Sequence, residues 1–104
     1  MREYEIALVV KPDLEKSAYE EIREKIASVL TKENGSVKTW NIWKERYKLA
    51  FTLRSRGADK QRYNDATYIL CEFLFNPHAL ASLKYVLDLE ERIIRYLIIN
   101  KELQ

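Results

Sequence analysis

The order in which two hydrophobic periodicities follow each other constrains the fold of this chain more than any other feature. Residues 3–11 alternate along a predicted β-strand, with Tyr4, Ile6, Leu8 and Val10 on one strongly apolar face. The spacing then becomes helical, returns to strand spacing twice, and repeats the helix and the strand once more. The predicted order of elements is therefore βαββαβ.

The first helix is predicted after a break at residues 12–13 (Pro-Asp). Ser17 and Glu20 stand three residues apart, as in a capping box, which predicts that the helix begins with Ser17 as its N-cap. Residues 34–35 (Asn-Gly) predict its end, because a left-handed C-cap residue is most often glycine. The apolar stripe of this helix consists of Tyr19, Ile22, Ile26, Val29 and Leu30.

A long hairpin is predicted in the middle of the chain. Residues 37–53 are rich in β-branched and aromatic side chains, which favours a strand. Residues 54–65 are polar, contain Gly57 and are predicted to form a long basic loop, and residues 66–75 form the next strand. The two faces of that strand are predicted to carry Cys71, Phe73 and Phe75 on one side and Tyr68, Leu70 and Leu74 on the other.

Residues 76–77 (Asn-Pro) are typical of a helix start, with an Asn N-cap and Pro at the first helical position. Leu80, Leu83 and Leu87 mark a short amphipathic helix that is predicted to end near Asp88. Residues 92–100 form the last predicted strand. Its faces are predicted to carry Tyr96 and Ile98 on one side and Arg95, Leu97 and Ile99 on the other.

These elements predict a single domain over residues 1–104 of the α+β class. Right-handed crossovers in a βαββαβ chain give a ferredoxin-like sandwich, a four-stranded antiparallel sheet with two helices on one face. The other face stays open and carries more apolar surface than a solitary monomer leaves in water. The residues expected there are Ala7, Val9, Leu70, Leu74, Leu97 and Ile99.

The basic residues are concentrated in one segment, although the formal net charge is only +2. Residues 36–63 hold eight Lys or Arg against two acids, a balance of +6 that leaves −4 for the rest of the chain. Such asymmetry is typical of a surface that binds a polyanion. An ordinary solvated hairpin is the alternative.

Few residues are suited to catalysis or to metal binding. One His and one Cys cannot complete a four-ligand zinc site. Glu20, Glu21 and Glu24 lie on the polar face of a helix, where we expect them to pair with Lys25 or with other surface charge. No nucleophile or orienting acid stands near His78 in the sequence, and Cys71 has no second cysteine for an internal disulfide. We expect no enzyme activity, cofactor, metal or small-molecule substrate.

The chain shows no pattern of secretion or of membrane insertion. Its N-terminus lacks the arrangement of a secretory signal, and its longest apolar runs are about five residues, far short of a span. A cytoplasmic protein without a membrane partner is expected.

Two other groups of proteins share the predicted order of elements. Acylphosphatases carry a Gly-rich anion-binding loop after the first strand, but residues 11–14 here read Lys-Pro-Asp-Leu. RNA-recognition modules stack bases on aromatic residues of the third strand. Here Tyr68 offers one ring, Leu70 replaces the second, and Glu72 adds a negative charge. Base stacking on the sheet is therefore not expected; the open face suits a protein, and the basic hairpin suits a phosphate backbone.

Four segments in chain order are similar to those of one known family. They are Tyr4-Glu5-Ile6 through Lys11-Pro12-Asp13-Leu14, Asn34-Gly35 with Val37, Trp43 with Arg46 and Leu49-Ala50-Phe51, and Ile93 to Ile99. Together they resemble the bacterial small-subunit ribosomal protein S-six family over nearly the whole chain. The departures from its Trp-Gly-x-Arg-x-Leu-Ala-Tyr stretch are Lys44 for the Gly, one additional residue before Leu49, and Thr52 for the Pro that usually follows.

The resemblance implies a structural role in the small ribosomal subunit. It implies binding to the central domain of small-subunit ribosomal RNA together with the eighteenth small-subunit protein. The RNA contacts expected from the matched segments are Arg2, Arg46 and Arg95, and those expected from charge are Lys44, Arg54, Arg56, Lys60 and Arg62. The partner contacts expected on the open sheet are Val9, Leu70, Leu97 and Ile99.

The alternative is a ferredoxin-like interaction or regulatory module that self-associates through its open sheet. Such a module dimerises alone and ignores RNA, whereas a ribosomal protein sediments with small subunits.

Overall fold

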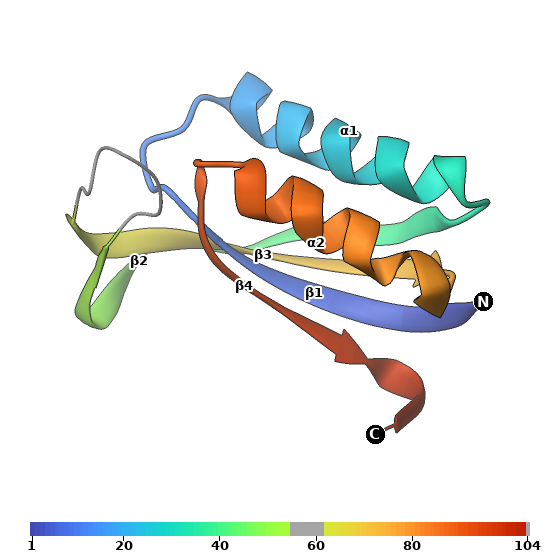
Figure 1. Cartoon of the computed structure of the whole chain (residues 1–104). Helices are drawn as coiled ribbons and strands as arrows, with labels where there is room; N and C mark the ends of the chain where they lie inside the picture. The colour runs from blue at the N-terminus through green and yellow to red at the C-terminus, as the bar shows by residue number, and fades with distance from the viewer. Residues whose placement is uncertain (55–61, 104) are drawn as a thin grey trace.

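The computed structural model describes residues 1–54 and 62–103; for residues 44–46, 50, 51, 53, 54 and 103 it describes the backbone alone. The elements are β1 (Arg2–Val10), α1 (Lys16–Lys32), β2 (Ser36–Arg54), β3 (Arg62–Phe75), a 3₁₀ turn (Pro77–Ala79), α2 (Leu80–Leu89), β4 (Ile93–Asn100) and a second 3₁₀ turn (Lys101–Leu103). Figure 1 shows their arrangement.

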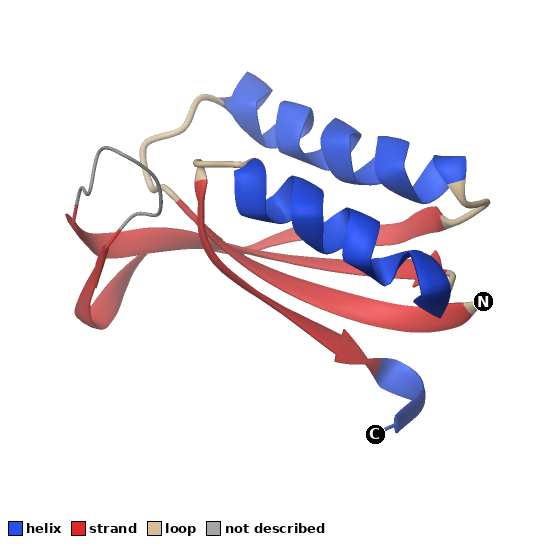
Figure 2. Ribbon diagram, in the orientation of Figure 1, coloured by secondary structure: helices blue, strands red, loops and turns tan. Residues whose placement is uncertain are grey.

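The four strands form one antiparallel sheet in the order β2-β3-β1-β4. Both helices cover the same face of this sheet, and no described helix lies on the opposite face (Figures 1 and 2). The ferredoxin-like α+β sandwich that the sequence predicts is therefore confirmed. In the described part of the chain, no helix is long and apolar enough to cross a membrane.

The core lies between the sheet and the two helices. Tyr4, Ile6, Leu8 and Val10 are at most 3% exposed, so the predicted apolar face of β1 is the buried one. The other strands and the helices contribute Ile69, Cys71, Phe73, Phe75, Ile93, Ile22, Ile26, Leu30, Leu83 and Leu87. Buried residues alternate along β1, a central strand, and along β3. A shift of either strand by one residue would turn these side chains toward water, so burial sets the register of the sheet.

The start of α1 differs from the prediction. The helix begins at Lys16 with Glu15 as N-cap, so Ser17 lies inside the first turn and makes no capping box. The carbonyl of Glu15 accepts the Ala18 N–H at 2.9 Å, which closes the first turn without a side-chain cap. The apolar stripe that includes Ile22 is buried in the core and stabilises the helix. This tertiary packing has more influence on where the helix begins than the capping-box pattern in the sequence.

The end of α1 also differs in one detail. Asn34, with φ 62°, holds the left-handed position that the sequence suggested for Gly35. The N–H of Gly35 donates to the Leu30 carbonyl at 2.7 Å and that of Asn34 to the Thr31 carbonyl at 3.1 Å, the pattern of a Schellman motif. Gly35 meets another requirement, because a Cβ there would lie 2.4 Å from the backbone oxygen of Leu74.

The hairpin of β2 and β3 is longer than predicted. β3 begins at Arg62 rather than at Ala66, so residues 62–65 are strand and not loop. They pair with the end of β2, including Leu53 with Tyr63. The Thr52 hydroxyl donates to the Asn64 side-chain oxygen at 2.9 Å across these strands, so polar side chains contribute to the pairing. The rest of the predicted loop, residues 55–61, lies outside the described residues.

The last elements follow the predictions closely. The Asn76 side chain accepts the His78 N–H at 3.1 Å, which confirms the N-cap before Pro77. α2 ends at Leu89, one residue after the predicted end. β4 begins at Ile93, and a register shift between Val9 and Val10 accompanies its pairing with β1.

Candidate functional site

The open face of the sheet is built from alternate residues of the strands. Ala7 of β1 pairs with Leu70 of β3 and Leu97 of β4, so these residues form one row across the sheet. Val9 and Ile99 lie in the rows on either side. Leu97 is 60% exposed and the others are partly buried. The structure thus brings together all four residues expected to contact a protein partner.

A charged network that the sequence did not reveal lies beside this apolar row. Lys38 donates to Glu3 at 2.9 Å, Lys101 pairs with Glu72, and the Thr39 hydroxyl donates to Glu72 at 3.2 Å. The hydrogen bond from Lys38 lowers the pKa of Glu3, and that from Lys101 lowers the pKa of Glu72. Both carboxylates are therefore ionised and matched by cations. The Lys38–Glu3 pair joins β2 to β1 and the Lys101–Glu72 pair joins the second 3₁₀ turn to β3, so the pairs become visible only in the folded sheet.

Three aromatic rings gather on the same face at the irregular part of β2. The Trp43 and Tyr47 rings lie 6.0 and 5.8 Å from the Tyr68 ring, each in an edge-on arrangement. Trp43 is 59% and Tyr47 46% exposed. The sequence did not predict that these three aromatic residues meet, because their grouping depends on how β2 pairs with β3.

The predicted RNA contacts do not gather at one place. Arg2 pairs with Phe75 at one end of β3, whereas Arg62 pairs with Arg54 at the other end. Arg95 is exposed on β4, and its guanidinium donates to the carbonyl of the preceding residue at 2.7 Å. The structure therefore separates Arg2 from the basic hairpin. Of the other candidates, Lys44, Arg46 and Arg54 lie in β2, and Arg56 and Lys60 fall outside the described residues.

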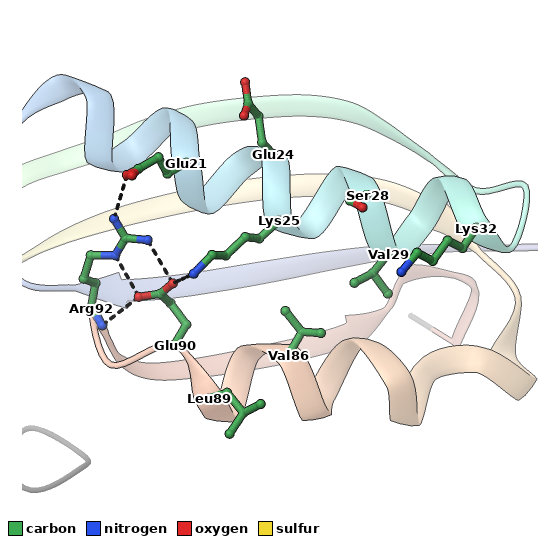
Figure 3. Close-up of a pocket in the computed structure, with 10 residues that line it drawn as sticks. All are labelled: Glu21, Glu24, Lys25, Ser28, Val29, Lys32, Val86, Leu89, Glu90 and Arg92. Atoms are coloured by element: carbon green, nitrogen blue, oxygen red, sulfur yellow. Dashed lines mark hydrogen bonds and ion pairs between the residues drawn. The ribbon is translucent and has the colours of Figure 1, made fainter.

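A groove of about 630 Å³ runs between α1 and α2 on the helical side (Figure 3). At its end the Glu90 carboxylate, 6% exposed, accepts hydrogen bonds from Lys25 at 2.7 Å and from the Arg92 side chain at 2.7 and 3.0 Å. Arg92 also pairs with Glu21 at 3.3 Å. Glu21 and Lys25 thus pair with the turn before β4 rather than with each other.

The four charged residues at the end of this groove, Glu21, Lys25, Glu90 and Arg92, link α1 to the turn before β4, and we call them the ionic joint. The hydrogen bonds from Arg92 hold the pKa of Glu90 at about 2, and the Glu90 carboxylate in turn raises the pKa of Arg92. The charges of Glu21, Lys25, Glu90 and Arg92 are thus matched to one another at this end of the groove. Among the described residues, no three His, Cys, Asp or Glu side chains gather as they would around a metal ion.

Comparison with known proteins adds independent information. Residues 3–100 match the family model described as "Ribosomal protein S6". "Small ribosomal subunit protein bS6" of Moorella thermoacetica is 32% identical and is covered over 96% of its length by 98% of this chain. The protein of the same name from Clostridium perfringens is 31% identical, with 98% of this chain and 99% of that protein covered.

A solved structure shows the same fold. The 30S ribosomal protein S6 of Thermotoga maritima superimposes with a TM-score of 0.76 at 18% identity, covering 97% of this chain and 88% of that one. The match at the level of fold agrees with the family match across residues 3–100. On this sequence evidence the chain belongs to the ribosomal protein S6 family and is a protein of the small ribosomal subunit.

Proposed function

We propose that this ribosomal protein binds the central domain of small-subunit ribosomal RNA through its basic hairpin and the eighteenth small-subunit protein through its open sheet. The observation that carries the proposal is the separation of the two kinds of surface. The balance of +6 falls on residues 36–63, a range that includes β2 and the start of β3. The apolar row of Ala7, Leu70 and Leu97 lies across the neighbouring strands.

The hairpin is suited to phosphate contacts. Arg62 and Lys48 are exposed there, and Arg54 lies beside Arg62 in the ladder. Cations that neutralise phosphates release counterions, so the affinity falls as the salt concentration rises. Contacts of this kind position a protein on the folded RNA, and base-specific contacts are few.

The proposed binding of RNA is tested by reversing the charge of basic residues on the hairpin. Replacing Arg54, Arg56 and Arg62 with Glu should weaken binding to a central-domain transcript and flatten the dependence of log affinity on log salt by about two units, at roughly 0.7–0.9 per lost phosphate contact. Filter binding at four salt concentrations measures this slope.

The control is a second triple variant with the same change in net charge. Its reversals to Glu are at Lys16, Arg23 and Lys84, which are exposed on the two helices. This control should keep the wild-type slope. Equal slopes in the two triple variants would remove the hairpin from RNA binding.

The proposed binding of the protein partner is tested by substituting two leucines of similar exposure. Leu97 on the open sheet is 60% exposed and Leu89 at the end of α2 is 64% exposed, so neither is needed for the core. Leu97→Lys should weaken binding to the purified eighteenth small-subunit protein at least about tenfold, because it places a charge in a desolvated interface. Leu89→Lys should leave the affinity unchanged.

Titration calorimetry measures both affinities, and the melting temperatures show that both variants fold. Wild-type binding by Leu97→Lys would exclude the open sheet as the interface. If the wild-type protein forms homodimers that Leu97→Lys dissociates, and binds neither the RNA nor the partner, the self-associating module is the correct interpretation.

A further inference from the structure

The two edges of the sheet differ in how regular they are. In the order β2-β3-β1-β4 the edge strands are β2 and β4, and among the described strands β4 pairs with β1 alone. From Arg95 to Asn100 this pairing has no register shift, whereas the pairing of β2 with β3 shifts repeatedly between Val37 and Leu53. Irregular edges resist the addition of a further strand, and regular edges favour it. The edge of β4 is therefore the one suited to pair with another chain.

One hydrogen bond shows which way the backbone groups of β4 point. The N–H of Lys11, next to β1, donates to the carbonyl of Arg92, next to β4, at 3.0 Å, so Lys11 faces β4. Consecutive residues of a strand turn their N–H and C=O groups to opposite sides, so Ala7, four residues before Lys11, faces β4 as well. Its partner is Leu97, whose backbone groups therefore point toward β1.

The same alternation directs the backbone groups of Ile98 out of the sheet. Ile98 follows Leu97 directly, so its N–H and C=O point away from β1, as does the N–H of Asn100 two residues later. No described strand lies beyond β4 to pair with them. An extended segment laid along this edge would pair with these groups, as in recognition by strand addition.

A groove of about 540 Å³ borders the same edge, between β4 and α2. Leu80 and Lys84 line it on α2, and Leu97, Ile98 and Asn100 line it on β4. Leu97 also belongs to the apolar row of the open sheet, so the groove is continuous with the surface proposed for the protein partner. Alternate side chains of an added strand would enter the groove, and the others would extend this row.

The charges at this edge favour an occupant that carries an acid. Lys84 is the charged residue that lines the groove; it is exposed, and its ammonium makes no ion pair with the described residues. Residues 92–101 contain three cations and no acid, so two copies of the chain paired through β4 would bring like charges together. A segment of another protein with a carboxylate beside Lys84 fits this edge better than a second copy does.

We propose that the eighteenth small-subunit protein adds an extended strand to the outer edge of β4, with apolar side chains in the groove and an acidic side chain beside Lys84. This inference rests on the proposed function, which assigns the open sheet to the same protein, and adds the way in which that protein is bound. Packing on a sheet face buries side chains, whereas strand addition also forms backbone hydrogen bonds at Ile98 and Asn100. The exchange of backbone amides therefore distinguishes the two modes of binding.

Hydrogen exchange of the isotope-labelled chain, followed by nuclear magnetic resonance, tests for the added strand. Without the partner, the amides of Leu97 and Ile99 should exchange slowly and those of Ile98 and Asn100 fast, because only the first two bond to β1. With the unlabelled eighteenth small-subunit protein in saturating excess, exchange at Ile98 and Asn100 should slow at least about tenfold, and the alternation should disappear.

A charge reversal tests the acidic side chain of the added strand. Lys84→Glu should weaken binding of the same protein about three- to tenfold, because two carboxylates would meet in the groove. Lys16→Glu is the matched control: Lys16 is exposed at the start of the other helix, α1, and its reversal should leave the affinity unchanged. Titration calorimetry measures both variants. An unchanged affinity for Lys84→Glu would overturn this occupant.

The outcomes separate this inference from the function on which it rests. If the partner binds and the alternation persists in the complex, strand addition is refuted while binding to the open sheet stands. If the partner does not bind, this inference and the proposed partner both fail. If the alternation disappears in the isolated chain as its concentration rises, a second copy occupies the edge and the inference is overturned.

Discussion

At the residue scale, Gly35 is required by a close contact with β3 that the neighbouring sequence does not reveal. A Cβ at this position would lie 2.4 Å from the Leu74 carbonyl oxygen and 2.9 Å from the Phe75 ring, so α1 turns into β2 in direct contact with β3. Neither atom can move away easily, because Leu74 is in the sheet and Phe75 is in the core. The glycine is needed for close approach rather than for its φ angle.

We predict that Gly35→Ala lowers the free energy of unfolding by about 2 kcal/mol or more, as overpacking against a rigid backbone does. The matched control is Asn34→Gly, which places a glycine at the residue with φ 62° and should change stability by less than about 1 kcal/mol. Urea denaturation followed by circular dichroism measures both variants. A fully stable Gly35→Ala protein would contradict the close approach.

Cys71 illustrates a residue whose chemistry is suppressed by its position. It is fully buried on the core face of β3, and burial raises the pKa of its thiol to about 12. The nucleophilic thiolate is therefore almost absent at neutral pH.

We predict that iodoacetamide does not alkylate Cys71 in the native protein at pH 8 over an hour and alkylates it fully in 6 M guanidinium (roughly complete unfolding for a domain this size). Mass spectrometry of the intact chain measures the adduct. Rapid native alkylation would mean that β3 opens far more often than its burial implies.

At the scale of elements, the ionic joint around Glu90 ties two segments together. It connects α1, through Lys25 and Glu21, to the turn between α2 and β4 that carries Glu90 and Arg92. Figure 3 shows these side chains converging at one end of the helical groove. The sequence placed Glu21 and Lys25 on a solvated helix face and did not reveal their partners, which lie more than sixty residues away.

The pH dependence of stability follows from the pKa of Glu90. Its folded pKa, about 2, lies below its ordinary value of 4.5, so the carboxylate stabilises the native state above about pH 4.5. This stabilisation is lost as the pH falls from 4.5 toward 2. We predict that wild type loses about 2 kcal/mol over this range from Glu90, less than the full shift implies because its partners are partly in water.

Glu90→Gln should be less stable than wild type at pH 7 by a similar amount and should show a flatter pH profile. Glu24→Gln, at an exposed position of α1 lining the same groove, is the control and should follow the wild-type profile. Thermal unfolding between pH 2 and 7 measures the three proteins. Parallel profiles for wild type and Glu90→Gln would show that the joint is not ionic.

At the scale of the whole molecule, both helices and the sheet share one hydrophobic core. Residues of α1, α2, β1, β3 and β4 belong to the same buried cluster, and Trp40 of β2 packs against it. The sequence-based prediction of a single domain implies that these elements unfold together.

We predict that helical circular dichroism and the emission of Trp40, measured in a Trp43→Phe variant, report the same urea midpoint and the same slope. Two separate transitions would contradict the single domain. As a protein of the small ribosomal subunit, the chain belongs to the ribosome of the cytoplasm.

The sequence alone determined the order of the elements, the ferredoxin-like arrangement and the buried face of every element except β2, because side-chain periodicity records which face leaves water. It also determined the concentration of cations on the hairpin and the likeness to one family. It placed the capping box and the start of β3 wrongly, since packing and strand pairing outweigh local signals there.

Only the tertiary structure decided which side chains meet across elements. Three groups of contacts join residues that are distant in sequence: the ion pairs of Lys25 with Glu90 and of Glu21 with Arg92, the network around Glu72, and the cluster of Trp43 with Tyr68. Their formation depends on helix packing, on strand register and on the bulges of β2. Helix packing, strand register and bulges are determined by the free energy of the whole folded chain, so no short stretch of sequence predicts them.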